Sequence, residues 1–265
     1  GASSQAGTVR LITNKPDPTG MSGNIKLGLS NTSGGDGSHN IEGVINIPVN
    51  DSLTVRAVAY VDKQGGYIDN VAGTIDASGS GRFRPAGTIR ENGLAVSAGR
   101  AGIQSTADLS GVNFLSSDND ALVKKDFNEA TYTGGRISAL YEFNENWTLL
   151  MGVSQQTLDS EGVFFVDPDL DDLQIQRYED DTLEDSFVNV NWTLEGRLGN
   201  LDVVYTGAFT EREADQFVDY TDYLFVGQYL PYYICDAAVS YPGASGPSGT
   251  CQAPNLFVKS RTETD

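Results

Sequence analysis

Residues 136–156 read RISALYEFNENWTLLMGVSQQ, and this stretch decides the fold. Apolar and polar residues alternate on both sides of a central Asn-Glu-Asn, which is a turn sequence. Since a period of two places successive side chains on opposite faces of a strand, the stretch predicts a β-hairpin with two unlike faces. The apolar face comprises Ile137, Ala139, Tyr141, Phe143, Trp147, Leu149, Met151 and Val153, and the polar face includes Arg136, Ser138, Glu142, Thr148, Gly152, Ser154 and Gln156.

The same alternation recurs on both sides of this hairpin. It is found in residues 24–30, 41–49, 53–61, 188–195 and 201–210, and residues 256–265 begin one further strand. Short polar stretches at 50–52, 144–146 and 195–200 predict tight turns, and the Gly-rich stretch 31–39 predicts a longer one. The chain is therefore predicted to be an all-β antiparallel protein with about seven or eight strands.

Three long segments interrupt the alternation, at residues 64–130, 159–185 and 211–255. They are rich in small, polar or acidic residues, and we expect little regular structure in them beyond a short helix near residues 120–127. Long links that alternate with short turns are typical of a transmembrane β-barrel, whose outer loops are long and whose inner turns are short. Tyr141, Phe143 and Trp147 would then lie at a membrane interface, and the polar face would line a water-filled or plugged lumen.

Composition narrows the functional classes. The chain has 265 residues, a net charge of -19 and 30 glycines, with a mean hydropathy of -0.28 and a pI of about 4.2. Because so negative a surface repels phosphate backbones, we expect no nucleic-acid partner. No apolar run reaches the roughly 18 residues of a membrane helix. His39 is the only histidine, and no nucleophile-elbow motif occurs, so we do not expect an enzyme.

The N-terminal stretch carries a family resemblance. Residues 1–18, GASSQAGTVRLITNKPDP, resemble the closing segment of the plug domain of TonB-dependent outer-membrane receptors, and residues 122–127 and 132–136 resemble that family's entry into a barrel strand. The resemblance implies that residues 1–20 end a plug domain and that residues 21–265 form the first part of a plugged barrel of about 22 strands. The energy-coupling box and most of the plug are missing upstream, so we expect the chain to be a piece of a longer precursor.

The resemblance also implies a function and a location. A receptor of this kind resides in the bacterial outer membrane, in contact with its lipid. It takes up a scarce nutrient, such as a siderophore, a vitamin or an oligosaccharide, by ligand-gated active transport. The inner-membrane TonB complex energises it through the N-terminus of the plug. The resemblance does not identify the small-molecule ligand.

The last long segment contains the candidate binding residues. Its tyrosines are either a flat platform for a ligand or packing within the loop, and both alternatives stay open. The two cysteines of the chain lie in the same segment, where an even pair suggests a disulfide and an oxidising compartment, against the alternative of two free thiols. The residues concerned are Tyr220, Tyr223, Tyr229, Tyr232 and Tyr233, with Cys235 and Cys251 for the disulfide.

One metal site is a weak candidate. In DPDLDD, residues 167–172, the carboxylates of Asp167, Asp169 and Asp171 recur at alternate positions, which suits calcium. The run departs from the helix-loop-helix calcium pattern, because its sixth position is Asp172 rather than glycine and its twelfth is Tyr178 rather than glutamate. The alternative is a solvated acidic loop, and no other cofactor is expected.

Two other functions fit parts of the sequence. A passive porin shares the barrel but has an open lumen without a plug, and a plug density would separate it from a gated receptor. A secreted acidic binding or adhesion protein would bury its apolar strand faces in a sandwich, and independence from detergent would identify it.

Overall fold

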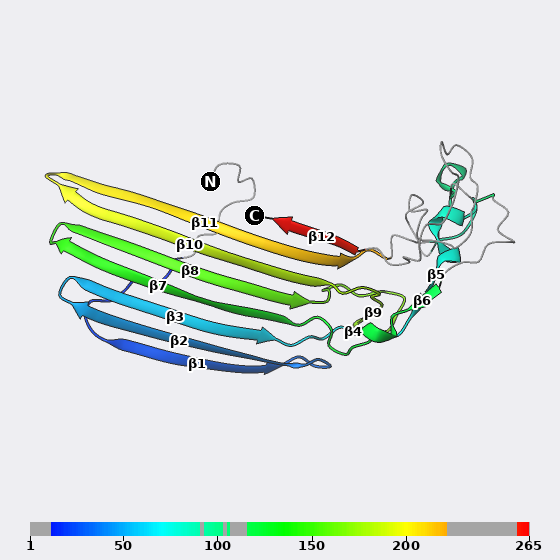
Figure 1. The fold of residues 1–265 in the computed structure, drawn as a ribbon, viewed down its shortest axis with the longest axis horizontal. Coiled ribbons are helices and arrows are strands. Elements are labelled where there is room, and N and C mark those ends of the chain that lie inside the picture. Colours follow the sequence, from blue (N-terminus) through cyan, green and yellow to red (C-terminus); the bar gives the residue numbers. More distant parts are fainter. Residues whose placement is uncertain (1–11, 91–92, 103–104, 107–115, 222–258, 265) are drawn as a thin grey trace.

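An eight-stranded antiparallel sheet makes up most of the molecule (Figure 1). The computed structural model describes residues 12–90, 93–102, 105–106, 116–221 and 259–264. The sheet has the order β1-β2-β3-β7-β8-β10-β11-β12. Its strands are β1 (Ser22–Asn31), β2 (Gly37–Asn50), β3 (Leu53–Gln64), β7 (Ala130–Asn144), β8 (Trp147–Glu161), β10 (Thr182–Leu198), β11 (Leu201–Asp219) and β12 (Lys259–Thr264).

The prediction of an all-β antiparallel fold is confirmed, but the sheet is open. Strands β1 and β12 are its two edges and do not pair with each other. The eight strands therefore form a curved wall (Figure 1), and the described residues do not close into a barrel. The described residues contain no helix long and apolar enough to cross a membrane.

The two ends of the sheet differ in their connections. The tight turns at residues 51–52, 145–146 and 199–200 lie at one end, and the connections after β3, β8 and β11 leave from the other end (Figure 1). Asparagines set two of the tight turns. Asn50 Oδ1 accepts hydrogen bonds from the backbone N–H groups of Ser52 and Leu53 at 2.9 Å, and Asn144 Oδ1 accepts one from Asn146 at 2.9 Å. Side-chain oxygens of asparagine commonly replace a backbone acceptor in this way.

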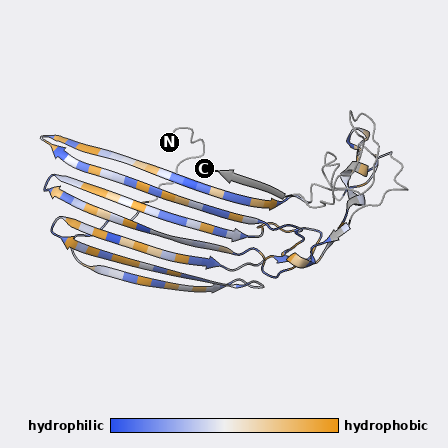
Figure 2. Ribbon diagram, viewed as in Figure 1, coloured by the Kyte–Doolittle hydropathy of each residue, from blue (hydrophilic) through white to orange (hydrophobic). Residues whose placement is uncertain are grey.

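The pairing register joins the apolar residues of different strands on one face. Directly opposed residues of an antiparallel pair share a face, and one such row crosses six strands from β2 to β11. Bands of apolar and polar residues accordingly alternate along the strands (Figure 2). The row consists of Ile45, Ala57, Ile137, Val153, Val190 and Phe209.

This apolar face is open rather than packed. Ile25 and Leu29 of β1 are 73% and 89% exposed, and Ile137 and Phe209 are 60% and 62% exposed. Soluble monomers rarely expose apolar patches larger than a few hundred square ångströms. The sheet therefore presents to its surroundings the kind of surface that a soluble domain buries.

Both tryptophans lie over cross-strand glycines on the apolar face. Trp147 opposes Gly196 and Trp192 opposes Gly207 in the register. A Cβ added at Gly196 would come within 2.1 Å of the Trp147 ring, and one at Gly207 within 2.4 Å of the Trp192 ring. The absence of a side chain at these glycines lets each indole lie against the sheet.

Gly207→Ala should displace the Trp192 ring and destabilise the β10–β11 hairpin by about 1–3 kcal/mol, the usual cost of overpacking. Gly43→Ala, also on the apolar face, is the control, because a Cβ there meets nothing within 4 Å. Tryptophan fluorescence and the urea midpoint of the refolded protein measure both effects. Equal midpoints for the two variants would contradict the prediction.

Several predicted boundaries are wrong. Residues 31–39 were expected to form one turn, yet β1 extends to Asn31 and β2 begins at Gly37, so His39 is in a strand. Strand β11 continues to Asp219 although residues 211–219 were expected in a loop, and the 159–185 link shrinks to residues 162–181. The reason is that the backbone ladder needs no apolar face, so strands continue beyond the residues that alternate.

The long link after β3 is more structured than predicted. Its described residues contain one small strand pair, one further strand whose partner lies in the link before β10, and four single 3-10 turns. The short helix expected near residues 120–127 is the last of these turns. The strands are β4 (Asp69–Asn70), paired in parallel with β9 (Gln174–Ile175), and β5 (Thr74–Asp76), paired with β6 (Ser116–Asp118). The 3-10 turns are η1 (Ala77–Gly79), η2 (Gly81–Phe83), η3 (Ala98–Arg100) and η4 (Asp120–Leu122).

Candidate functional site

The polar face of the sheet surrounds a hollow of about 710 Å³. Its lining comes from six neighbouring strands, β2 to β11, together with residues of the segment that precedes β1. A single hollow can touch six strands only if the sheet curves around it. Polar lining residues include Glu42, Tyr60, Arg136, Ser138, Ser154, Asn189 and Asn191.

The segment that precedes β1 lies across this polar face. Thr13, Asn14 and Lys15 line the hollow, and Lys15 Nζ is 3.9 Å from a carboxylate oxygen of Glu195 on β10. Pro16 is buried. The chain therefore enters the sheet from the inner, polar side.

Asn46 of β2 holds the segment that precedes β1 against the sheet. We call this segment, residues 12–21, the entry segment. Its side chain is completely buried and makes three hydrogen bonds to backbone groups. The backbone N–H of Asp17 donates to Asn46 Oδ1 at 2.9 Å, and Asn46 Nδ2 donates to the carbonyls of Asp17 and Gly20 at 2.8 and 3.0 Å. The hydroxyl and N–H of Thr19 donate to the Asp17 carboxylate and hold the pKa of that carboxyl below its ordinary value.

Asn46→Ala should release the entry segment, because it leaves one donor and two acceptors of the backbone without partners at a cost of about 1–3 kcal/mol. We expect faster amide exchange at Asp17 and new protease cleavage near residues 15–20. Asn24→Ala, an exposed asparagine on the polar face of β1, is the control and should leave both unchanged. Identical amide exchange at Asp17 in the two variants would contradict the role of Asn46 in holding the entry segment.

Beyond the long-loop end of the sheet, buried asparagines tie the links together. The side chain of Asn70 donates to the Leu122 carbonyl at 2.8 Å and to the Arg177 carbonyl at 3.2 Å, and it accepts from the Arg177 N–H at 2.8 Å. Asn119 bridges Gly73, Val71 and Arg177 in the same way. Both asparagines are at most 2% exposed. Segments more than 100 residues apart are thus joined by side-chain amides that stand in for backbone partners.

A buried ion pair adds to these contacts between the links. We call the described residues of 65–129 and 162–181 the loop cluster. Arg177 donates from Nε to Asp181 Oδ2 at 2.7 Å and from a terminal nitrogen to Asp181 Oδ1 at 2.9 Å, a bidentate contact. The same guanidinium donates to the Asp219 carbonyl at 2.7 Å, and the Asp219 carboxylate accepts from the N–H groups of Tyr178 and Glu179. The three charged side chains are only 1–4% exposed. Through its contact with Asp219, Arg177 joins the link before β10 to the end of β11.

A cavity lies between residues of the loop cluster, and we call it the outer cavity. It has a volume of about 380 Å³ and is bounded by Ile75, Phe165, Pro168, Gln176 and Tyr178. Phe165 is 55% exposed, and the Arg177 guanidinium lies 5.5 Å from its ring centroid. Elsewhere in the links, Asp126, whose backbone N–H donates to Asp69 Oδ1 at 3.0 Å, adopts a positive φ of 52°. Burial raises the pKa of the Asp126 carboxyl, and the charges of Asp36 and Asp69 raise it further.

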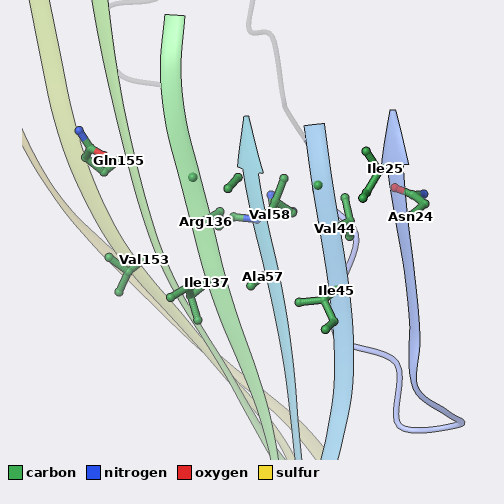
Figure 3. Close-up of a pocket in the computed structure, with 13 residues that line it drawn as sticks. Asn24, Ile25, Val44, Ile45, Ala57, Val58, Arg136, Ile137, Val153 and Gln155 are labelled. Carbon is green, nitrogen blue, oxygen red and sulfur yellow. The ribbon is translucent and has the colours of Figure 1, made fainter. Parts of the chain in front are cut away.

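The apolar face carries a shallow groove of about 640 Å³. Ile45, Ala57, Ile137 and Val153 lie side by side across β2, β3, β7 and β8 in it (Figure 3). Near the tight turns, Tyr141 and Phe143 meet edge to face with ring centroids 4.9 Å apart and are 41% and 54% exposed. The predicted aromatic residues are therefore on the apolar face and accessible.

Most of the predicted binding residues lie outside the described residues. Tyr220 is half-buried just after β11. The other tyrosines and both cysteines fall in residues 222–258, outside the described part of the chain, so the ligand platform and the disulfide stay predictions. These residues are Tyr223, Tyr229, Tyr232, Tyr233, Cys235 and Cys251.

Asp167, one of the predicted calcium ligands, stabilises a turn by accepting hydrogen bonds from the backbone. Asp167 Oδ1 accepts the N–H of Asp169 at 2.9 Å, and the Asp167 carbonyl accepts the N–H of Leu170 at 3.2 Å. Within the described ranges, no group of three or more His, Cys, Asp or Glu residues is placed to hold a metal ion. Calcium binding by Asp167, Asp169 and Asp171 stays a prediction.

Sequence analysis did not identify the role of Asn46 in holding the entry segment, or the buried Arg177–Asp181 ion pair. Asn46 was not singled out, although an asparagine between two isoleucines was a usable signal. Arg177 was not singled out either, because its partners are 4 and 42 residues away. Comparison with known proteins adds no assignment, because no family model, curated protein or solved structure matches the chain.

Proposed function

We propose that the protein is a TonB-dependent outer-membrane receptor, of which this chain forms the end of the plug and the first strands of the barrel. One observation carries the proposal. The sheet exposes an apolar face across its strands, and Thr13, Asn14 and Lys15, from the stretch that resembles the end of a plug, lie on the opposite, polar face. A porin would lack such a segment, and a soluble sandwich would cover the apolar face.

Lipid is the occupant that suits the apolar face. Burying one exposed leucine or isoleucine in an apolar medium contributes about 1.5–3 kcal/mol, and the exposed row spans β2 to β11. Strands need only about 9–11 residues to span the hydrocarbon core, and each main strand from β1 to β11 has at least 10 residues. The difference between tight turns at one end and long links at the other also supports a barrel wall.

The proposed transport mechanism involves no chemistry on the substrate. A nutrient binds the outer loops and the plug, and TonB pulls on the plug from the inner membrane. The pull shifts the plug to a state that leaves a path along the polar face of the barrel, so the energy comes from outside the protein. Asn46 would hold the end of the plug to the wall during this change.

Nutrient uptake by bacteria that carry the complete receptor tests the function. Cells with and without the receptor gene are grown on siderophores, vitamins and oligosaccharides as sole sources, with and without a protonophore. We expect receptor-dependent uptake of one class that stops when the proton-motive force is removed. Uptake that persists after de-energisation would indicate a passive porin, and recovery of the protein in the soluble fraction would indicate a secreted β-protein.

A further inference from the structure

Most charged side chains of the polar face are paired. Lys26 contacts Glu42 on the neighbouring strand at 3.0 Å, and Arg197 lies 3.5 Å from Asp202. Arg212 forms a bidentate contact with Asp185. In a chain with a net charge of -19, a cation near the sheet readily finds a carboxylate.

Among the cations of the described polar face, Arg56 and Arg136 are the two without an ion pair. Neither has an ion pair or a hydrogen bond to any described residue, and Arg56 Nε is a buried donor without a partner. The register pairs Arg56 of β3 with Ser138 of β7, two residues from Arg136. Diagonal neighbours of this kind lie about 7–8 Å apart, and the two half-buried guanidiniums repel each other.

The neighbouring residues do not compensate this charge. The Asp17 carboxylate senses Arg56 electrostatically, but its hydrogen bonds come from Thr19. Glu42 is engaged with Lys26. Thr13, Asn14 and Lys15, which line the hollow on this face, bring no carboxylate to it.

We propose that Arg56 and Arg136 form a binding site for a small oxyanion, a carboxylate- or phosphate-bearing solute, on the wall of the lumen. Guanidinium groups bind carboxylates and phosphates through two parallel N–H bonds. Arg136 lines the hollow of about 710 Å³ beside Tyr60 and Ser138, and this volume falls in the range of small-molecule pockets. The proposal deepens the proposed function, on which it rests, by giving the substrate class.

Chemical modification of the unaltered full chain tests the site. The purified protein in detergent is treated with phenylglyoxal in citrate or in sodium chloride of equal ionic strength, and modified arginines are mapped by mass spectrometry. At a citrate concentration of about ten times its Kd, occupancy of the site should slow modification of Arg56 and Arg136 by about tenfold. Arg197, whose side chain is 62% exposed, is the internal control and should react equally in both salts.

Two outcomes would overturn the site. Equal rates at Arg56 and Arg136 in citrate and chloride would mean that the pair binds no oxyanion. Resistance of both arginines to phenylglyoxal in chloride would mean that polypeptide already covers them.

Substitution gives a second, independent measurement. The double variant Arg56→Gln, Arg136→Gln should weaken calorimetric binding of citrate at least about tenfold, and Arg197→Gln should leave it unchanged. Loss of binding in both variants would contradict the assignment. Because neither assay involves transport, protection by citrate without energised uptake would refute the proposed function alone, and energised uptake without protection would refute the site alone.

Discussion

Phe209→Arg is expected to prevent stable insertion of the protein into the outer membrane. Phe209 lies in the middle of β11 at the end of the apolar row that starts at Ile45, and its side chain is 62% exposed. A charged residue on the lipid face costs about 2–4 kcal/mol near the bilayer midplane. The folded fraction after refolding into lipid vesicles, read from heat-dependent gel mobility and from urea titration, should fall accordingly.

Ala208→Arg is the matched control for this variant. Ala208 is the preceding residue of the same strand, is also exposed, and faces the polar side. In water, arginine at either exposed position would change stability by no more than about 0.5 kcal/mol. A large difference between the two variants therefore requires that the apolar face meet lipid, and similar behaviour of both would refute the barrel-wall assignment.

Arg177→Gln should loosen the loop cluster by about 3–5 kcal/mol, the second large effect. The substitution leaves the carboxylates of Asp181 and Asp219 buried without a cation, and breaking a buried pair costs more than the pair contributes. Amide exchange in residues 162–181 and cleavage by a protease added outside the cell report the loosening. The β2–β3 and β7–β8 ladders should keep their protection, because they lie outside the cluster.

Arg212→Gln is the control, since it also removes a bidentate Arg–Asp contact. The Arg212 side chain is 65% exposed, against 3% for Arg177. Exposed pairs contribute about 0–1 kcal/mol, so this variant should keep its protection. Equal loss in the two variants would show that burial does not decide the effect.

The two regions of the molecule respond to different environments. Stability of the wall depends on its apolar face and on the medium around it. The loop cluster combines its buried polar groups with buried apolar side chains, among them the cluster of Ile68, Val163 and Ile175 with Tyr67 packed against it. The hydrogen bonds of Asn70 and Asn119 and the Arg177 ion pair hold the links around the outer cavity together.

Sequence analysis predicted the strands of the eight-stranded sheet more accurately than the contacts of the candidate site. Alternation identified the strands and the correct partition of Ile137 and Arg136 onto opposite faces, because a period of two is a local property. The strand ends at Asp219 and Gly37 were missed, because backbone pairing continues without that pattern. The pairing of Arg177 with Asp181 and Asp219 and the contact of Asn46 with Asp17 could not be read, because each depends on the register of strands far apart in the chain.

The sequence alone determined that this chain forms antiparallel strands with one apolar and one polar face, connected by tight turns and long links. These features follow from side-chain alternation and turn chemistry within short stretches. Only the tertiary structure decided that the sheet stays open, that the entry segment crosses the polar face at Asn46, and that Arg56 and Arg136 lie together without partners. The physical reason is that curvature, register and side-chain pairing arise from contacts between strands.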